Sequence, residues 1–182
     1  MRIIAGEARG RTLKAPRGEK TRPTSDRVRE ALFSILEARL ELAGVVVLDL
    51  YAGSGALALE ALSRGAERAV LVDRAGPALR VLRENVHALG YDARCRVLPL
   101  PAEAALVRLA AADETFGLIL ADPPYADDPL PLLADLSAGP LLASGGLVVF
   151  EHDRRRSLPA ASGRLTLEVA RVYGDTALSL YA

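Results

Sequence analysis

The sequence predicts an α/β fold built on a doubly wound sheet, and two features of the chain carry this prediction. The expected strands Val45–Leu50, Ala69–Val72 and Leu118–Leu120 are apolar runs without alternation, as in strands buried on both faces of a parallel sheet. Strands and helices alternate in the order β-α-β-α-β-α-β up to Asp122, which is typical of an open parallel sheet. At 182 residues, the chain fits one such domain with a small appendage.

The remaining elements extend this sheet. We expect helices within 57–62, 77–89, 103–112 and 129–142, and further strands over 94–98 and 147–151. Gly145-Gly146 is expected to form the turn before the last of these strands. A closing hairpin over 165–173 and 177–181, divided by Gly174-Asp175, adds two antiparallel strands. The complete expectation is a seven-stranded mixed sheet.

The composition indicates a cytoplasmic protein without structural metal. No apolar run approaches the ~18 residues of a membrane span, and no signal-peptide core is recognisable. The single cysteine, Cys95, excludes an internal disulfide and is expected to lie buried on a strand. Neither His87 nor His152 belongs to a cluster of metal ligands, and both are expected to be solvated. We expect a monomer that binds neither metal nor membrane.

The charge of the chain is zero overall but uneven along its length. Residues 1–30 hold nine Lys and Arg against four Asp and Glu, a net charge of +5, and the remainder carries −5. Basic charge concentrated in one segment favours contact with a polyanion. The alternative is a solvated basic segment without a partner. Another charged run, Arg154-Arg155-Arg156, is interpreted as a solvated loop, with RNA contact as its alternative.

The basic segment predicts a small extension over 1–43, made of a hairpin, a loop and a helix. Arg2–Ala5 and Arg11–Lys14 are extended candidates joined around Gly6–Gly10. Thr24, Ser25 and Asp26 are all suitable helix caps before an apolar stripe at positions 28, 31, 32, 35, 36 and 40. The candidate phosphate-contacting residues are Arg9, Arg11, Lys14, Arg22, Thr24 and Arg27. Residues 44–182 then form the catalytic domain.

A glycine-rich turn follows the first strand and predicts a nucleotide-type half-site. Gly53-Ser54-Gly55-Ala56-Leu57-Ala58 satisfies the dinucleotide fingerprint with alanine in third place. Asp49 precedes Gly53 by four residues, where a carboxylate repels a pyrophosphate but binds an ammonium group. Asp73, at the end of the next strand, is placed to accept both hydroxyls of a ribose. S-adenosylmethionine has an ammonium, a ribose and no phosphate, so we favour it over a nicotinamide dinucleotide.

Asp122-Pro123-Pro124-Tyr125 ends the fourth strand and predicts a site for a planar amine. Each proline disfavours helix at the residue before it, so Asp122 and Pro123 are held extended with their carbonyls exposed. A carboxylate and carbonyl acceptors are then followed by a flat ring. The alternative is an ordinary surface turn. Asp49, Asp73 and Asp122 all stand at the carboxyl ends of parallel strands, the edge where such sheets bind ligands.

These motifs resemble a known family. Asp49-Leu50-Tyr51-Ala52-Gly53-Ser54-Gly55 is similar to the cofactor motif of class I S-adenosylmethionine-dependent methyltransferases, and Asp122-Pro123-Pro124-Tyr125 resembles the catalytic motif of those that methylate exocyclic amines. Together with Met1–Gly6, Arg22-Pro23-Thr24, Asp26–Glu30 and Ala52–Ala66, they resemble the bacterial 16S ribosomal RNA guanine-N(2) methyltransferases. The resemblance implies a Rossmann-like fold and, as substrate, one guanine in a loop of small-subunit ribosomal RNA, modified during 30S assembly.

The resemblance also implies the site residues. The cofactor would contact Asp49, Tyr51, Ala52, Gly53, Ser54, Gly55, Asp73, Arg74, Ala102 and Glu103. Many members have Asp or Asn before an alanine where this chain has Pro101-Ala102-Glu103, so its backbone or Glu103 would read the adenine. The catalytic residues would be Asp122, Pro123, Pro124 and Tyr125. Some members carry Phe in place of Tyr125, which makes base stacking its expected role.

Our mechanistic hypothesis is that Asp122 and the Pro123 carbonyl accept the two N–H groups of the guanine amine, while Tyr125 stacks on the base. Three alternatives remain open from the sequence. One is a DNA adenine or cytosine amine methyltransferase, although few residues are available for reading a DNA sequence. Another is a nicotinamide-dependent oxidoreductase, which Asp49 disfavours. The third is a non-enzymatic RNA-binding assembly factor.

Overall fold

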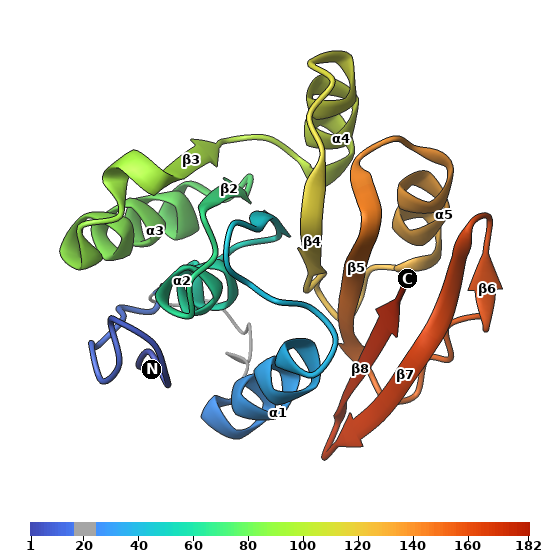
Figure 1. Ribbon diagram of the computed structural model, residues 1–182, viewed down its shortest axis with the longest axis horizontal. Coiled ribbons are helices and arrows are strands. Elements are labelled where there is room, and N and C mark those ends of the chain that lie inside the picture. The colour runs from blue at the N-terminus through green and yellow to red at the C-terminus, as the bar shows by residue number, and fades with distance from the viewer. Residues whose placement is uncertain (17–24) are drawn as a thin grey trace.

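The computed structural model describes residues 1–16 and 25–182. Its helices are α1 (Asp26–Glu37), α2 (Ala56–Ser63), α3 (Gly76–Leu89), α4 (Ala102–Ala111), α5 (Leu130–Ala138) and the short 3₁₀ helix η1 (Asp92–Arg94). Its strands are β1 (Val46–Leu50), β2 (Arg68–Val72), β3 (Cys95–Leu98), β4 (Phe116–Ala121), β5 (Leu142–Asp153), β6 (Ala161–Ser162), β7 (Leu165–Tyr173) and β8 (Thr176–Tyr181). Figure 1 shows these elements in sequence colours.

The strands form one mixed sheet in the order β3-β2-β1-β4-β5-β8-β7-β6. β1 to β5 are parallel, and β8, β7 and β6 pair antiparallel. The doubly wound mixed sheet is therefore confirmed, with eight strands in the described residues where we expected seven. The additional strand, β6, has two residues at the sheet edge, too few to leave a sequence pattern of their own.

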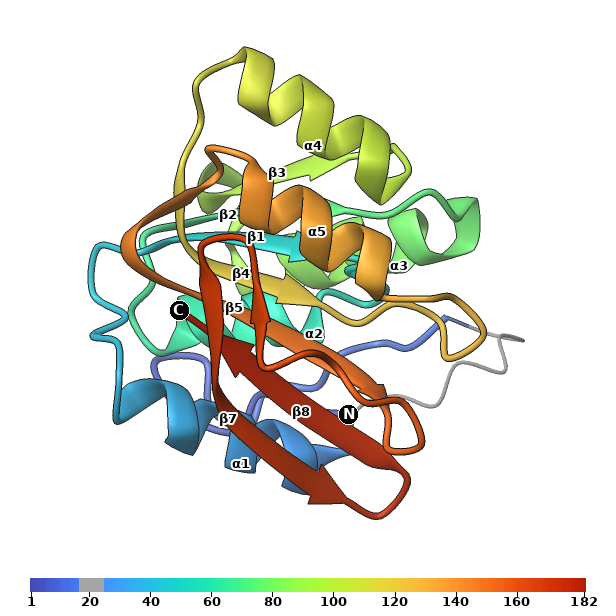
Figure 2. The same ribbon diagram turned by 90° about the vertical axis from the view of Figure 1, so that its right-hand side faces the viewer.

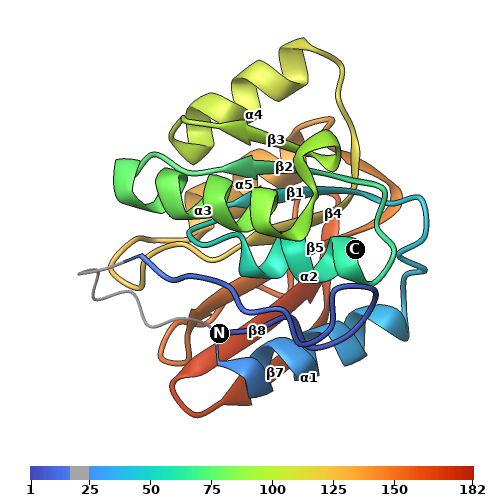
Figure 3. The same cartoon turned by 90° about the vertical axis from the view of Figure 1, so that its left-hand side faces the viewer.

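Helices cover both faces of the sheet, which explains the unbroken apolar strands. Figures 2 and 3 show α4 and α5 on one face and α1, α2 and α3 on the other. Successive residues of one strand enter opposite layers. Val47 belongs to the apolar cluster that contains residues of α1, α2 and α3, whereas Leu48 belongs to the cluster that contains residues of α4 and α5. Because β1, β2, β4 and β5 are parallel, their carboxyl ends reach the same edge of the sheet.

One expectation about β5 was wrong. Gly145-Gly146 lies inside this strand and does not form a turn before it. The pairing with β4 shifts from Phe116↔Leu142 to Leu118↔Leu147, so a bulge takes up the extra residues of β5. A side chain at Gly146 would collide with Leu142 and with the carbonyl oxygen of Gly117. The bulge thus brings backbone atoms close to Gly146, which explains this glycine, whereas Gly145 has φ of +72°, a conformation that favours glycine.

The N-terminal segment packs on α2. We expected a regular hairpin in this segment, but its described residues form a single antiparallel bridge, between Arg2 and Thr12. Ile3 and Leu13 are buried in the same apolar layer as α1 and α2. The amides of residues 4 and 5 donate to the buried carboxylate of Glu60, at 2.8 and 3.0 Å. The segment is therefore fixed by main-chain bonds to the helix that follows the glycine-rich turn.

Helix α1 begins where the sequence predicts but buries one unexpected charge. Ser25 is the N-cap, and its Oγ accepts a hydrogen bond from the Val28 amide. The buried stripe includes Phe33 and Arg29, which the apolar pattern omits. Arg29 is fully buried because it donates to Asp26 and to the Arg2 carbonyl and lies 3.9 Å from Glu60.

The expected solvation of the two histidines holds for His87 and fails for His152. His87 is exposed on α3. His152 is buried in β5, where Nδ1 donates to the Asp153 carbonyl and Nε2 bonds to Ser179 Oγ at 2.9 Å. Burial lowers its pKa, in keeping with a neutral ring held by two partners. None of the helices among residues 1–16 and 25–182 is long and apolar enough to cross a membrane.

Candidate active site

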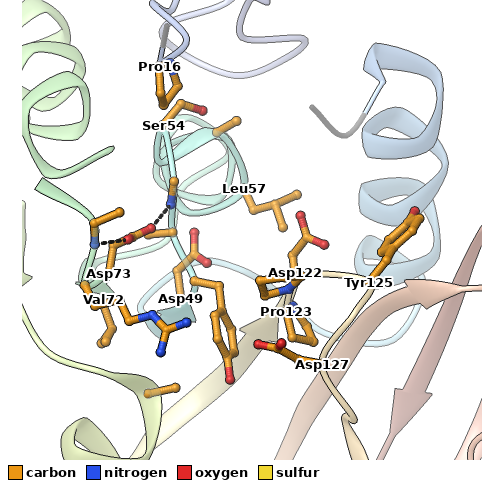
Figure 4. A pocket seen from close by; sticks show the side chains of 18 of the residues that line it. Pro16, Asp49, Ser54, Leu57, Val72, Asp73, Asp122, Pro123, Tyr125 and Asp127 are labelled. Atoms are coloured by element: carbon orange, nitrogen blue, oxygen red, sulfur yellow. Dashed lines mark hydrogen bonds between the residues drawn. The ribbon is translucent and has the colours of Figure 1, made fainter. Parts of the chain in front are cut away.

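A cavity of about 1040 Å³ opens at the carboxyl edge of the parallel strands. All four predicted catalytic residues line it, as do nine of the ten predicted cofactor residues. Figure 4 shows Asp73, Asp49 and Asp122 in that order across the cavity, with Tyr125 beyond Asp122. The three strand-end carboxylates therefore lie around one cavity, because β1, β2 and β4 are parallel neighbours.

The exception is Gly55, which shapes the turn from behind. It is the N-cap of α2 with φ of +82°, a conformation that favours glycine. A side chain there would meet Leu82 Cδ1 at 2.5 Å. Its amide donates to the Ala52 carbonyl, which closes the turn. Gly55 thus sets the path of the loop and does not line the cavity.

Asp73 anchors the glycine-rich loop to the end of β2. Its Oδ2 accepts the Gly53 amide and its Oδ1 accepts the Ala75 amide, both at 2.8 Å. The carboxylate also lines the cavity. One side chain therefore joins the loop to the neighbouring strand end and faces the space where a ligand would bind.

Asp49 is a buried acid of the cavity. Its side chain is 1% exposed, and Oδ2 accepts the Ala58 amide at 3.2 Å. Burial raises its pKa to about 7, and the charge of Asp73 acts in the same direction. A cation bound in the cavity would favour the ionised carboxylate. The chemistry of this acid therefore fits an ammonium-bearing ligand and disfavours a phosphate.

The predicted catalytic segment follows β4 directly. Asp122 and Pro123 line the cavity, and the Pro124 carbonyl accepts the Asp127 amide at 2.8 Å, which closes a turn after the motif. The Tyr125 hydroxyl bonds to Thr176 Oγ1 at 2.7 Å. The segment thus combines a carboxylate, rigid proline backbone and an aromatic ring in the cavity that the glycine-rich loop also lines.

One wall of the cavity contains two acids that sequence reasoning missed and two arginines of the run that it interpreted as a solvated loop. Asp153, Arg154, Arg155 and Asp175 line it from the end of β5 and from the β7–β8 turn. Arg155 bonds to both carboxylate oxygens of Asp153, at 3.0 and 3.1 Å from Nε, and holds the pKa of that acid well below its usual range. β5 is parallel to β4, so the strand-end rule that identified Asp122 would also have identified Asp153.

The N-terminal segment supplies a second wall that no sequence signal indicated. Met1, Ala15 and Pro16 line the cavity beside the glycine-rich loop. In Figure 4, Pro16 lies next to Ser54. The cavity lining thus joins residues far apart in the chain, which is why local patterns could not predict this wall.

The predicted phosphate-contacting residues that the structure describes lie outside the cavity lining. Arg9, Arg11, Lys14 and Arg27 are exposed. Arg11 donates to the Ala88 carbonyl and Lys14 pairs with Glu84 at 2.9 Å, so both side chains lie along α3. The other two predicted contacts, Arg22 and Thr24, lie outside the described residues.

Comparison with known proteins places the chain in a family. The model of the family described as "Conserved hypothetical protein 95" matches residues 1–182. The "Putative rRNA methyltransferase YlbH" of Bacillus subtilis is 38% identical over 182 residues, which cover 100% of this chain and 98% of the relative. The "Ribosomal RNA small subunit methyltransferase D" of Escherichia coli K12 is 35% identical over 189 residues, 100% and 89% of the two chains.

A solved structure agrees with these relatives. The hypothetical protein TTHA0928 of Thermus thermophilus superposes with a TM-score of 0.86 at 41% identity, over 99% of this chain and 98% of that one. Family, relatives and fold therefore agree along the whole chain. The chain belongs to the "Conserved hypothetical protein 95" family, and its resemblance to the bacterial 16S ribosomal RNA methyltransferases, which are class I S-adenosylmethionine-dependent enzymes, is confirmed.

Proposed function

We propose that this protein transfers the methyl group of S-adenosylmethionine to the exocyclic 2-amino group of a guanine in 16S ribosomal RNA during 30S assembly. The observation that carries the proposal is the order of side chains in one cavity: Asp73 and Asp49 on the cofactor side, then Asp122 and Tyr125. The names of the relatives support a ribosomal RNA substrate.

The cofactor half of the cavity would be used as follows. Asp49 would bind the ammonium of the amino-acid part, and Asp73 would accept the ribose hydroxyls. Arg74, Ala102 and Glu103 would surround the adenine, beside the loop formed by Tyr51, Ala52, Gly53, Ser54 and Gly55. Burial makes the charged form of the Asp49 carboxylate less favourable and raises its pKa, and a neighbouring cation would favour the charged form, which fits this ligand. When bound, the sulfonium provides an activated methyl group with a good leaving group.

The substrate half of the cavity would align and activate the amine. The lone pair of a guanine 2-amino group is delocalised into the ring, so the nitrogen is a weak nucleophile. Asp122 and the Pro123 carbonyl would accept its two N–H groups and favour a more tetrahedral nitrogen. The carboxylate would also stabilise positive charge that develops on nitrogen as the N–C bond forms. Tyr125 would stack on the base after it leaves its loop.

The extension over 1–43 would hold the RNA. Arg9, Arg11, Lys14, Arg22, Thr24 and Arg27 would contact phosphates, and residues 44–182 would perform the chemistry. Binding through such contacts is independent of sequence and weakens as the salt concentration rises. Selection of one guanine would then depend on the shape of the RNA loop and on the cavity.

The proposal is tested with labelled S-adenosylmethionine and unmethylated 16S ribosomal RNA, free and assembled into 30S particles. The RNA is digested to nucleosides, and the labelled nucleoside is identified. Label in N(2)-methylguanosine is expected, with the particle as the better substrate. Label in methyladenosine would contradict the guanine assignment. Absence of label, with the cofactor bound, would direct the search to DNA substrates and then to a non-enzymatic assembly role.

A further inference from the structure

Asn85 bridges the N-terminal segment and the glycine-rich loop. It is the one asparagine of a chain that has no glutamine, and it lies on α3 with 2% of its surface exposed. Oδ1 accepts the Lys14 amide at 2.9 Å. Nδ2 donates to the Lys14 carbonyl at 3.0 Å and to the Ser54 carbonyl at 2.9 Å. Three backbone groups from two distant segments thus converge on one buried side chain.

The chemistry of the three partners fixes the orientation of this amide. The Lys14 N–H can only donate, so it must face Oδ1, and the two carbonyls can only accept, so they must face Nδ2. Both Nδ2 hydrogens are used. No other type of side chain of the same size offers one acceptor and two donors in this arrangement. Asn85 is thus specifically suited to hold Lys14 and Ser54 together.

Both ends of the bridge belong to functional parts of the molecule. Ser54 lines the cavity within the glycine-rich loop, and its Oγ lies 3.6 Å from Met1 Sδ. On the other side, the Lys14 side chain is exposed and is followed directly by Ala15 and Pro16, which line the cavity. A phosphate bound by the Lys14 side chain would therefore restrain the Lys14 backbone, which Asn85 joins to the glycine-rich loop.

We propose that Asn85 is a positioning residue that couples RNA contact at the N-terminal segment to cofactor binding at the glycine-rich loop. RNA that holds the segment in place also restrains the loop, so the loop loses less conformational freedom when the cofactor binds. The coupling is reciprocal: bound cofactor strengthens RNA binding by the same factor. This inference rests on the proposed RNA substrate, but its loop-positioning part does not.

The test uses the full-length protein, unmethylated 16S ribosomal RNA and S-adenosylhomocysteine, which has the ammonium and ribose but no methyl group to transfer. Asn85→Asp keeps the size of the side chain and removes both Nδ2 donations. The matched control is Ser63→Ala. Ser63 Oγ accepts the Ala8 amide and donates to the Ala5 carbonyl, so this variant loosens the same segment without touching the loop.

Dissociation constants of S-adenosylhomocysteine are measured by equilibrium dialysis with and without saturating RNA, after thermal unfolding shows each variant to be folded. We expect RNA to tighten cofactor binding about fivefold or more in the wild type and in Ser63→Ala. In Asn85→Asp, we expect weaker binding without RNA and no tightening by RNA. The inference is overturned if RNA tightens cofactor binding by Asn85→Asp as much as by the wild type, or if RNA does not tighten cofactor binding by the wild type. It is also overturned if Ser63→Ala loses as much cofactor affinity as Asn85→Asp.

Failure of the proposed function would be recognised separately. Methyl transfer to guanine by the same wild-type preparation, with no effect of RNA on cofactor affinity, would overturn the coupling alone. If the wild type neither binds nor methylates RNA, the proposed substrate and the coupling both fail. The RNA-free comparison of Asn85→Asp with Ser63→Ala then still decides whether Asn85 positions the cofactor loop.

Discussion

The hydroxyl oxygen of Tyr125 lies 2.7 Å from Thr176 Oγ1, so the segment that follows β4 is bonded to the first residue of β8. Thr176 is buried, and it stands next to Asp175, which lines the cavity. The terminal hairpin therefore does more than complete the sheet. It orients the ring that we expect to stack on the target base.

This hydrogen bond predicts that substitution of either partner lowers kcat/KM slightly, and that the two effects are not additive. Tyr125→Phe and Thr176→Val should each lower kcat/KM for RNA by less than about tenfold, since each removes one hydrogen bond worth about 1 kcal/mol. The double variant should be no worse than either single one. Tyr125→Ala should cost more, because the ring is lost and base stacking is worth about 1–3 kcal/mol. Steady-state kinetics on all four variants would contradict this account if the effects of the first two were additive.

Asp49 predicts a pH dependence of cofactor affinity. Its pKa of about 7 lies above the usual value, so the buried carboxylate is mostly protonated in acid and ionised in base. S-adenosylhomocysteine should therefore bind more tightly as the pH rises from 5.5 to 8, with a slope of at most about tenfold per pH unit below the pKa. Asp49→Asn should bind weakly with a flat profile. The affinities are measured by calorimetry. If the wild type and Asp49→Asn showed the same dependence of affinity on pH, a group other than Asp49 would be responsible for it.

The raised pKa of Asp49 also predicts that a rise in pH lowers the stability of the ligand-free protein, whereas it strengthens cofactor binding. A carboxyl with a raised folded-state pKa contributes stability below its usual value of 3.8, and this contribution is lost as the pH rises through about 7. Asp49→Asn removes the buried charge. Its free energy of unfolding relative to the wild type should accordingly increase between pH 5 and pH 8, which denaturant titrations at both pH values can measure.

Two glycines of the N-terminal segment provide a matched pair. Gly6 and Gly10 have φ of +82° and +83°, so alanine is strained at both by about 1 kcal/mol. At Gly10 a Cβ would meet nothing within 4 Å, whereas at Gly6 it would lie 1.7 Å from the Ser63 carbonyl oxygen. Gly6→Ala should therefore cost about 1–3 kcal/mol more in unfolding free energy than Gly10→Ala. Equal costs in urea titrations would mean that the segment is not seated on α2.

Arg64 forms ion pairs with one buried acid and one exposed acid, so the stability contributions of the two kinds of ion pair can be compared. Arg64 lies 2.8 Å from Glu60, which is fully buried, and 2.9 Å from Glu37, whose side chain is 48% exposed. Glu60→Ala should cost about 3–5 kcal/mol, since it leaves Arg64 Nε and two backbone amides without their acceptor and removes the charge that lies 3.9 Å from the buried Arg29. Glu37→Ala should cost about 0–1 kcal/mol. Equilibrium unfolding would refute this difference if the two variants had the same midpoint and slope.

The parts of the protein that the sequence predicts are those that follow from local pattern and from one rule of topology. Unbroken apolar strands predict a sheet covered on both faces, and the parallel order brings Asp49, Asp73 and Asp122 to one edge. The glycine-rich turn is predicted from its local motif, and the full set of cofactor residues is what the family resemblance implies. The rule was applied to β1, β2 and β4 but not to β5, which is why Asp153 was missed.

The rest depends on contacts between distant segments. Burial of Arg29 requires Glu60 on α2, burial of His152 requires Ser179 on β8, and the role of Asn85 requires Lys14 and Ser54. Each of these side chains is polar, so composition and periodicity assign it to the surface. Only the tertiary fold supplies the partner that makes its burial favourable.

Asp122 provides the most direct test of the central claim that this cavity methylates an amine. Asp122→Ala should abolish single-turnover methyl transfer to 16S ribosomal RNA in 30S particles, while the dissociation constant of S-adenosylmethionine stays within about twofold of the wild type. The carboxylate is expected to contact the amine and not the cofactor. Unchanged turnover in Asp122→Ala would contradict the account.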